Sequence, residues 1–186
     1  MRVEDFLRQV CATLEEAGVQ YMLTGSLASS IHGVPRSTQD VDIVVAPREE
    51  QLATLIEAFQ SRGLYVSGEE AASAFRLRTQ FNVIDFANGW KADLLLRKER
   101  EFSLLEFGRR VEMDLQGMRL VVASAEDVLI SKLEWAKVGG SDRQIEDAAG
   151  IVRLQGDELD LAYVERWVAS LLLQEQWQSV RSRATA

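Results

Sequence analysis

The sequence predicts an α+β fold in which a small mixed β-sheet with flanking helices is followed by a helical region. Short apolar runs typical of strands alternate with helical patterns through residues 1–123. Two of these runs flank an Asn-Gly pair, which is a strong hairpin signal. After residue 123 the apolar period is helical to the end of the chain. We therefore expect a core over residues 1–123 and a helical region over residues 124–186 that packs on this core.

The first elements are predicted from apolar spacing and from the glycines that end each run. Residues 3–17 have helical spacing and stop at Gly18, which suits a helix C-terminus. The further elements expected in this part are a strand over 19–24, a short helix over 26–32, a loop over 34–39, a strand over 40–45 and a helix over 47–62 with Pro47 in its first turn.

The middle of the chain predicts two hairpins. Residues 81–86 and 90–96 are the strands around the Asn-Gly turn, and residues 109–115 and 118–123 form a second pair around Gly117. Before them, residues 64–67 are a strand candidate and residues 69–75 a helical turn.

Three helices are predicted after residue 123, each with a polar residue at its start. Ser124 caps the first helix, which ends at residues 138–140, and Ser141 caps the second. The third begins near Asp160 and runs through Trp177.

Composition excludes several classes of protein. The chain has 186 residues, of which 47% are hydrophobic and 27% charged, so it can bury a core and is not disordered. Its net charge of -8 argues against a sequence-blind nucleic-acid binder but allows a protein that recruits Mg²⁺ to an acidic pocket. A single cysteine and the lack of a long apolar run predict a cytoplasmic protein with no membrane partner.

Two aspartates stand at the start of a predicted buried strand. Strand alternation places Asp40 and Asp42 on one face and Val41 on the other. Two carboxylates on one face repel each other unless a cation lies between them, and a pair of Mg²⁺ ions would remove this conflict. Asp40 and Asp42 are therefore candidate metal ligands.

A Gly-Ser pair precedes these aspartates where a strand turns into a helix. Gly25 allows close approach of the backbone to a ligand, and a helix N-terminus that begins at Ser26 attracts anions. A triphosphate bound here, with metal ions held by Asp40 and Asp42, would give nucleotidyl transfer.

This pattern resembles the nucleotidyltransferase superfamily of the DNA polymerase β type. Its signature is Gly-Ser or Gly-Gly followed, after a spacer, by Asp-x-Asp or Asp-x-Glu, and residues 27–39 are the spacer here. The resemblance implies two Mg²⁺ ions, a nucleoside triphosphate such as ATP as substrate, and a third carboxylate on a neighbouring strand. Asp93 matches that third position and would complete the set of metal ligands.

Three segments further resemble the AbiEii-type branch, the nucleotidyltransferase toxins of type IV toxin–antitoxin systems. These segments are "LTGSLASSIHGVPRSTQDVDIVV", "FNVIDFANGWKADLL" and "SAEDVLISKLEWAK…RQIEDAAGIV". The resemblance implies that Lys132 and Asp147 complete the site. It also implies a toxin that modifies tRNA or a protein, with an antitoxin as a possible partner.

The acceptor of the nucleotide stays open at this stage. The long inserted acceptor-binding region of the larger toxins is missing, so a small molecule such as an antibiotic is an alternative acceptor. A basic group that could serve an RNA acceptor comprises Arg76, Arg78, Arg97, Lys98 and Arg100. A catalytically idle binding module with this fold is the alternative from another class.

Several candidate residues have a second interpretation. Asp85 competes with Asp93 as third ligand, or serves as a turn residue of the hairpin. Arg36 either contacts the phosphates of the nucleotide or pairs with a carboxylate.

Two residues of the helical region are equally ambiguous. Lys132 either reaches triphosphate oxygens or is a solvated helix residue. Asp147 belongs to the site, or is a surface charge or the partner of Arg143 or Lys132.

Overall fold

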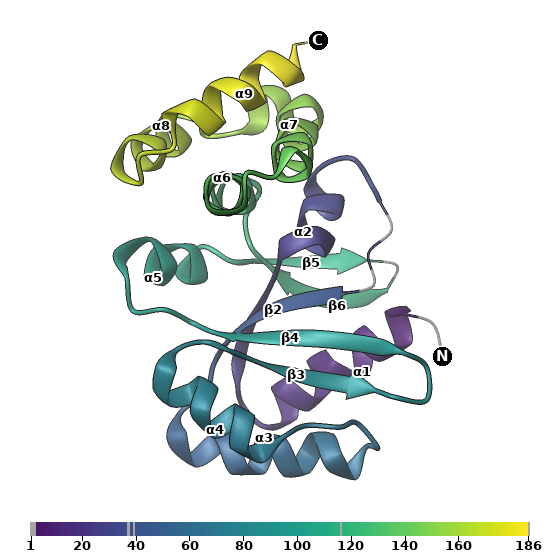
Figure 1. Cartoon of the computed structure of the whole chain (residues 1–186). Coiled ribbons are helices and arrows are strands. Elements are labelled where there is room, and N and C mark those ends of the chain that lie inside the picture. The colour runs from purple at the N-terminus through teal and green to yellow at the C-terminus, as the bar shows by residue number, and fades with distance from the viewer. Residues whose placement is uncertain (1–2, 37, 39, 116, 186) are drawn as a thin grey trace. The chain divides into compact units, whose positions relative to one another are not determined.

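A computed structural model of the chain describes residues 3–36, 38, 40–115 and 117–185 (Figure 1). The chain forms two compact units. The first unit comprises Met1–Leu23 and Thr38–Val122, and the second comprises Thr24–Ser37 and Ala123–Ala186. Residues 24–36 thus group by their contacts with the helices after residue 123, which the sequence did not predict. Ser37 and Gln39 of the predicted loop lie outside the described residues.

The first unit is built on a mixed sheet. In the described residues the sheet has six strands in the order β3-β4-β2-β1-β6-β5. Its strands are β1 (Gln20–Thr24), β2 (Asp40–Ala46), β3 (Gln80–Asp85), β4 (Trp90–Leu96), β5 (Val111–Leu115) and β6 (Met118–Val122). Both predicted hairpins are confirmed, since β3 pairs with β4 and β5 with β6 in antiparallel register. The pairs β2–β4 and β1–β6 are parallel.

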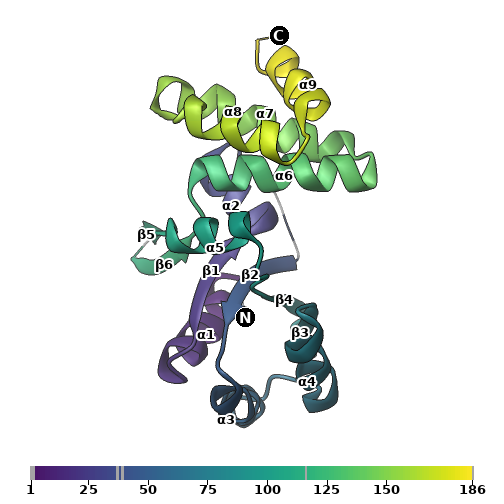
Figure 2. The ribbon, with the colours of Figure 1, turned by 90° about the vertical axis from the view of Figure 1, so that its left-hand side faces the viewer.

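Three helices of the first unit pack on one another and on the sheet: α1 (Val3–Glu16), α3 (Glu49–Ser61) and α4 (Gly68–Leu77). A fourth helix of this unit, α5 (Glu101–Gly108), lies apart from these three. Helix α3 contacts both α1 and α4, while α1 contacts β4 and α4 contacts β3. Figure 2 shows α1, α3 and α4 gathered below the strands.

Strand alternation decides which side chains enter the core. Val41, Ile43 and Val45 of β2 are buried, and Ala92 and Leu94 of β4 lie beside them in register. Full burial of each aliphatic side chain of this size stabilises the fold by about 1.5–3 kcal/mol. The residues between them therefore have their side chains on the opposite face.

The second unit is helical. It contains α2 (Gly25–His32), α6 (Ala125–Gly139), α7 (Asp142–Gln155), a 3₁₀ turn (Gly156–Glu158), α8 (Leu161–Ser170) and α9 (Gln174–Ala184). Ser124 caps α6 as predicted, because its side chain accepts a hydrogen bond from the Asp127 amide. Asp160 caps α8 in the same way, accepting from the Tyr163 amide.

The prediction of one last helix from Asp160 through Trp177 is wrong. The chain turns at Leu171 and Leu172 and starts again as α9. Leu172 has φ of 57°, a left-handed conformation that a side chain with a Cβ rarely adopts. The apolar pattern continues across the turn because both helices bury residues, so periodicity alone does not reveal the break.

Three predicted details of the first unit also differ. Residues 64–67 form no strand, since only Tyr65 pairs, in a single bridge with Ile84. Pro47 precedes α3 instead of lying in its first turn, because Arg48 is the N-cap. Helix α5 was not predicted, because its short run of eight residues has weak amphipathic character.

A close approach of two helices shapes the second unit. A Cβ added at Gly33 would lie 2.9 Å from the Ile151 amide nitrogen and 2.9 Å from the Ser29 carbonyl oxygen. Only a glycine at the end of α2 lets α7 come this near. The contact places α2 beside the turn of α7 that precedes Ile151.

The predicted α+β class is confirmed, with a mixed sheet and a helical region after residue 123. No helix in the described part of the chain is long and apolar enough to span a bilayer.

Candidate functional site

Three aspartates of the first unit lie on the sheet face opposite the core. Asp40 and Asp42 alternate with buried residues of β2, and Asp93 does the same on β4. In the parallel register Asp42 is directly opposite Asp93. Adjacent strands lie about 4.8 Å apart, so these two carboxylates are neighbours. We call Asp40, Asp42 and Asp93 the carboxylate cluster.

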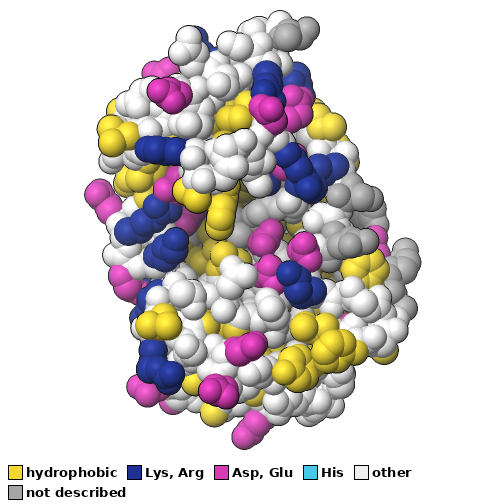
Figure 3. Space-filling view, in the orientation of Figure 1, with side chains coloured by type: hydrophobic (Ala, Val, Ile, Leu, Met, Phe, Trp, Pro, Cys, Tyr) yellow, Lys and Arg dark blue, Asp and Glu magenta, His cyan; other side chains and the backbone are white. Residues whose placement is uncertain are grey.

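A lysine stands next to the carboxylate cluster. Lys91 is opposite Asp40 in the same register, and its Nζ lies 3.1 Å from Asp93 Oδ1 and 3.5 Å from Asp40 Oδ1. Burial would lower the pKa of Lys91, but the hydrogen bonds and charges of Asp93 and Asp40 raise it above its usual value. Acidic side chains gather beside a basic one over β2 and β4 in Figure 3. No motif in the sequence marks Lys91 as part of a site.

The chemistry of the carboxylate cluster suits a hard divalent cation. Carboxylate oxygens are preferred ligands of Mg²⁺. Asp93 Oδ1 is buried and receives no hydrogen bond, so one ligand atom lacks a donor although the Lys91 ammonium is near. Within residues 3–36, 38, 40–115 and 117–185, no three His, Cys, Asp or Glu side chains converge closely enough to hold a metal ion. The donor set fits Mg²⁺ in chemical kind only, and the ammonium of Lys91 balances part of its negative charge.

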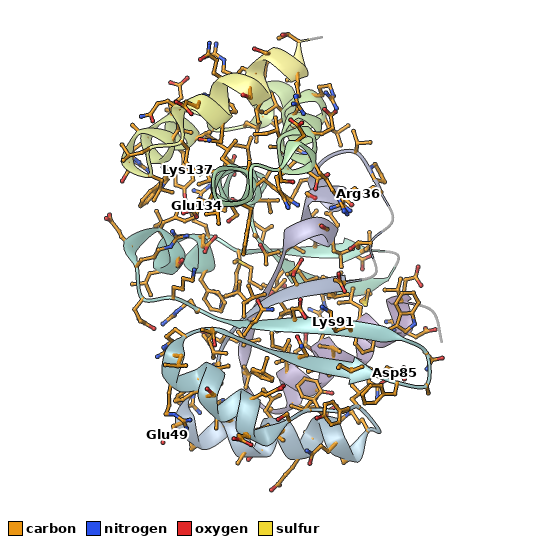
Figure 4. The ribbon with its side chains drawn as sticks, in the orientation of Figure 1. Arg36, Glu49, Asp85, Lys91, Glu134 and Lys137 are labelled. Carbon is orange, nitrogen blue, oxygen red and sulfur yellow. The ribbon has the colours of Figure 1, made fainter. Side chains whose placement is uncertain are left out.

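Asp85 does not belong to this cluster. It follows Phe81 and Val83 on the core face of β3 and is 5% exposed. Its Oδ1 accepts hydrogen bonds from the amides of Ala87 at 3.0 Å and Asn88 at 3.2 Å. Figure 4 shows Asp85 near the hairpin end of β3, away from Lys91 on β4. The interpretation of Asp85 as a turn residue is confirmed.

In the second unit, Asp147 of α7 binds two cations. Arg36 donates from Nε to Oδ1 at 2.9 Å and from Nη2 to Oδ2 at 3.0 Å. Lys132 of α6 donates from Nζ to Oδ2 at 2.8 Å. Burial by itself would raise the pKa of Asp147, but the hydrogen bonds from Arg36 and Lys132 lower it below its usual value. We call Arg36, Lys132 and Asp147 the Asp147 cluster.

The two cations of the Asp147 cluster differ in accessibility. The Lys132 side chain is 4% exposed, whereas the Arg36 side chain is 23% exposed. The interpretation of Lys132 as a solvated helix residue is therefore wrong, and that of Arg36 as the partner of a carboxylate is confirmed. Arg36 is the cation of this cluster that a ligand can reach more easily.

The Gly-Ser pair begins α2 as expected. Gly25 has φ of 63°, so the chain enters the helix in the left-handed region that favours glycine. Ser26 Oγ accepts a hydrogen bond from Arg36 Nη2. The structure thus brings Ser26 and the Asp147 cluster together in one unit through Arg36, which Figure 4 labels.

The single histidine is structural. His32 is buried, and its Nε2 lies 2.8 Å from the Ala123 carbonyl oxygen. Burial lowers the pKa of His32, so the ring is neutral at pH 7.

Neither a protein-family model nor a curated protein matches this chain. Several solved structures do. ANT(2'')-Ia in complex with adenylyl-2''-tobramycin has a TM-score of 0.62 and 17% identity, over 93% of this chain and 97% of that one. An antigenic nucleotidyltransferase-like protein from Paracoccidioides brasiliensis has a TM-score of 0.58 and 17% identity, over 95% and 91% of the two chains.

A third similar structure is the lincosamide antibiotic adenylyltransferase LnuA in its lincomycin-bound form. Its TM-score is 0.56 with 12% identity, over 80% of this chain and 95% of that chain. These identities are low, so the similarity is one of fold. The chain has the nucleotidyltransferase fold.

Proposed function

We propose that the protein is a Mg²⁺-dependent nucleotidyltransferase. It would transfer a nucleoside monophosphate from a nucleoside triphosphate to an acceptor hydroxyl and release pyrophosphate. The observation that supports this most is the row of carboxylates on one sheet face, with Asp42 directly opposite Asp93. These carboxylates repel one another and lie on the sheet face opposite the core, so they do not contribute to core packing.

The carboxylate cluster has the role of holding the metal ions in this proposal. Asp40, Asp42 and Asp93 would hold the metal ions. When bound, Mg²⁺ supplies charge neutralisation for the triphosphate and lowers the pKa of the attacking hydroxyl. The hydroxyl oxygen would form a bond to the α-phosphorus while the bond from that phosphorus to pyrophosphate breaks, and the hydroxyl proton would pass to water.

Residues of the second unit would bind the triphosphate. Gly25 and Ser26 offer the start of α2, where backbone amides and the helix dipole favour anions. Arg36 would donate to phosphate oxygens, since its guanidinium carries several donors and is partly exposed. Lys132 and Asp147 would set the position of Arg36, and Lys132 would add positive charge.

We propose a small molecule with a hydroxyl group as the acceptor. Two solved structures of similar fold are antibiotic adenylyltransferases, one with adenylyl-2''-tobramycin and one lincomycin-bound, and the match covers 97% and 95% of those chains. The net charge of -8 disfavours RNA. Part of the basic group is also neutralised, because Glu99 pairs with Arg78 at 3.6 Å and Arg97 at 3.2 Å.

The AbiEii-type motifs support a second acceptor class. They would make the protein a toxin that modifies tRNA or a protein and is controlled by an antitoxin. The two classes differ in the size of the labelled product, so one experiment can separate them.

The experiment uses the whole protein with Mg²⁺ and each of four α-labelled nucleoside triphosphates. Separate reactions receive aminoglycosides, lincosamides, total tRNA or a cell lysate. We expect label on a small molecule with one nucleotide, and loss of at least 100-fold in rate in Asp42→Asn and Asp93→Asn. Asp85→Asn is the matched control for each, because Asp85 lies on the other face of the sheet.

Transfer at the wild-type rate in Asp42→Asn would exclude this function. Label on tRNA or on a polypeptide would replace the small-molecule acceptor with the toxin class. Calorimetry with Mg²⁺ and nucleoside triphosphates tests the alternative of a catalytically idle binding module. That alternative predicts no metal-dependent binding of nucleotide.

A further inference from the structure

Asn82 extends the carboxylate cluster by one strand. It lies on β3 between Phe81 and Val83, which point into the core, so its side chain is on the same face as Asp93. In the antiparallel register Asn82 is directly opposite Asp93, and Asp93 is directly opposite Asp42. The three side chains therefore form a row across β3, β4 and β2.

Two oxygen atoms of this row lack hydrogen-bond donors. Asn82 Oδ1 and Asp93 Oδ1 are both buried, and neither accepts a hydrogen bond. The Lys91 ammonium lies 3.1 Å from Asp93 Oδ1 and offers it charge. Buried oxygens without donors are uncommon in native proteins, and an ion or an ordered water usually accounts for them. Two such oxygens at directly opposite positions indicate one common partner.

We propose that Asn82 is a further ligand residue, whose Oδ1 binds the divalent cation of the carboxylate cluster, directly or through one water of the ion. This inference rests on the proposed function. An amide oxygen is a hard ligand that Mg²⁺ accepts. It is neutral, so it adds a ligand without adding to the repulsion among three aspartates. Mg²⁺ retains several waters in most protein sites, and an amide oxygen can accept a hydrogen bond from one of them.

The alternative is a structural role, in which the Asn82 amide group donates a hydrogen bond to Asp93 and keeps it in place. The two roles respond differently to a carboxylate at this position. An oxygen ligand remains in Asn82→Asp, whereas a donor is lost and replaced by a charge that repels Asp93. Asn82→Leu removes both functions with little change of volume.

The test measures Mn²⁺ affinity by calorimetry without nucleotide, and thermal unfolding with and without Mn²⁺. We expect Asn82→Leu to weaken Mn²⁺ binding about ten-fold and Asn82→Asp to bind at least as tightly as the wild type. Without Mn²⁺, the midpoint of unfolding of Asn82→Leu should not fall. Gln80→Leu is the matched control, since Gln80 is on the same face of β3, exposed and opposite Leu95; its Mn²⁺ affinity should be unchanged.

Wild-type affinity in Asn82→Leu would overturn the inference. Equal weakening in Asn82→Leu and Asn82→Asp, or a lower unfolding midpoint of Asn82→Leu without Mn²⁺, would establish the structural role instead. The variant Asp93→Asn distinguishes failure of the inference about Asn82 from failure of the proposed function. If Asp93→Asn loses Mn²⁺ and Asn82→Leu does not, only the inference fails, whereas a wild type that binds no Mn²⁺ overturns both.

Discussion

At the scale of single residues, the two clusters differ in how their charges are balanced. The Asp147 carboxylate accepts hydrogen bonds from two cationic side chains, Arg36 and Lys132, and both belong to the second unit. The carboxylate cluster has three acidic side chains, and Lys91 bridges Asp93 and Asp40. The Asp147 cluster is therefore balanced by its own cations. The carboxylate cluster has excess negative charge that a further cation could neutralise.

Replacement of Lys91 by methionine should tighten binding of divalent cations. The Lys91 ammonium competes with a metal ion for Asp93 and Asp40, and it is about one-third exposed, so its effect is screened by solvent. We expect a gain of about 1 kcal/mol, or roughly five-fold in Mn²⁺ affinity. Calorimetry measures this change. Lys98→Met alters the net charge equally at an exposed position and should have no such effect; an equal gain in both variants would refute local competition.

Replacement of Asp147 by asparagine should destabilise the second unit. The change keeps the shape of the side chain but leaves the buried Lys132 ammonium and Arg36 without their carboxylate. Removal of one partner of a buried ion pair costs about 3–5 kcal/mol. Urea unfolding measures the loss. Glu146→Gln is the control, because the Glu146–Arg153 pair is exposed and should contribute less than about 1 kcal/mol.

At the scale of elements, helix α2 depends on two glycines with different functions. Gly25 starts the helix with a positive φ, and Gly33 ends it against the backbone of α7. The second contact is the more demanding, because backbone atoms cannot move aside as a flexible side chain can. It also holds Ser26 and Arg36 of this segment near Asp147.

Gly33→Ala should therefore destabilise the protein by about 1–3 kcal/mol, as other overpacked sites do. Chemical unfolding with the same denaturant reports this value directly. Gly139→Ala, in α6 with no atom within 4 Å of the added methyl, should be neutral or slightly stabilising. A loss of the same size at both positions would contradict close packing at Gly33 as the cause.

Particular elements show how far the sequence predicts this structure. The alternation Asp40-Val41-Asp42 was enough to place both carboxylates on one face, because strand geometry has a fixed period of two. The resemblance implied Asp93 as a third carboxylate on a neighbouring strand. Its position directly opposite Asp42 was not predictable, since it depends on the register between strands far apart in the sequence. The Asn-Gly turn predicts that the strand with Asn82 pairs with the strand that carries Asp93. Which residues lie opposite each other depends on the turn type, so the position of Asn82 opposite Asp93 was not predicted. Lys91 and the turn at Leu172 gave no recognisable pattern.

At the scale of the whole molecule, His32 makes the free energy of unfolding depend on pH below about 6.5. Burial lowers the pKa of His32 below 6.5, so the unfolded chain binds more protons than the folded one in that range. Stability is thus fully present above pH 6.5 and declines as the pH falls toward the pKa of the folded state. Asp147 acts in a lower window, since its pKa is lowered from 3.8 and its contribution is lost only as the pH falls through that lower value.

Unfolding free energies measured from pH 7.5 to 5 should therefore decrease below pH 6.5 in the wild type. His32→Gln keeps a donor toward the Ala123 carbonyl but cannot titrate, and its decrease should be smaller. Identical slopes in the two proteins would mean that His32 is not the titrating group.

The proposed function requires that Asp42 and Asp93 bind the same divalent cation. A crystal structure of the wild-type protein with Mn²⁺ and a non-hydrolysable nucleoside triphosphate, measured with anomalous scattering, tests it most directly. We predict a Mn²⁺ peak within coordinating distance of carboxylate oxygens of both residues, with Lys91 moved away from Asp93. A bound triphosphate whose Mn²⁺ has no contact to either aspartate would contradict the claim.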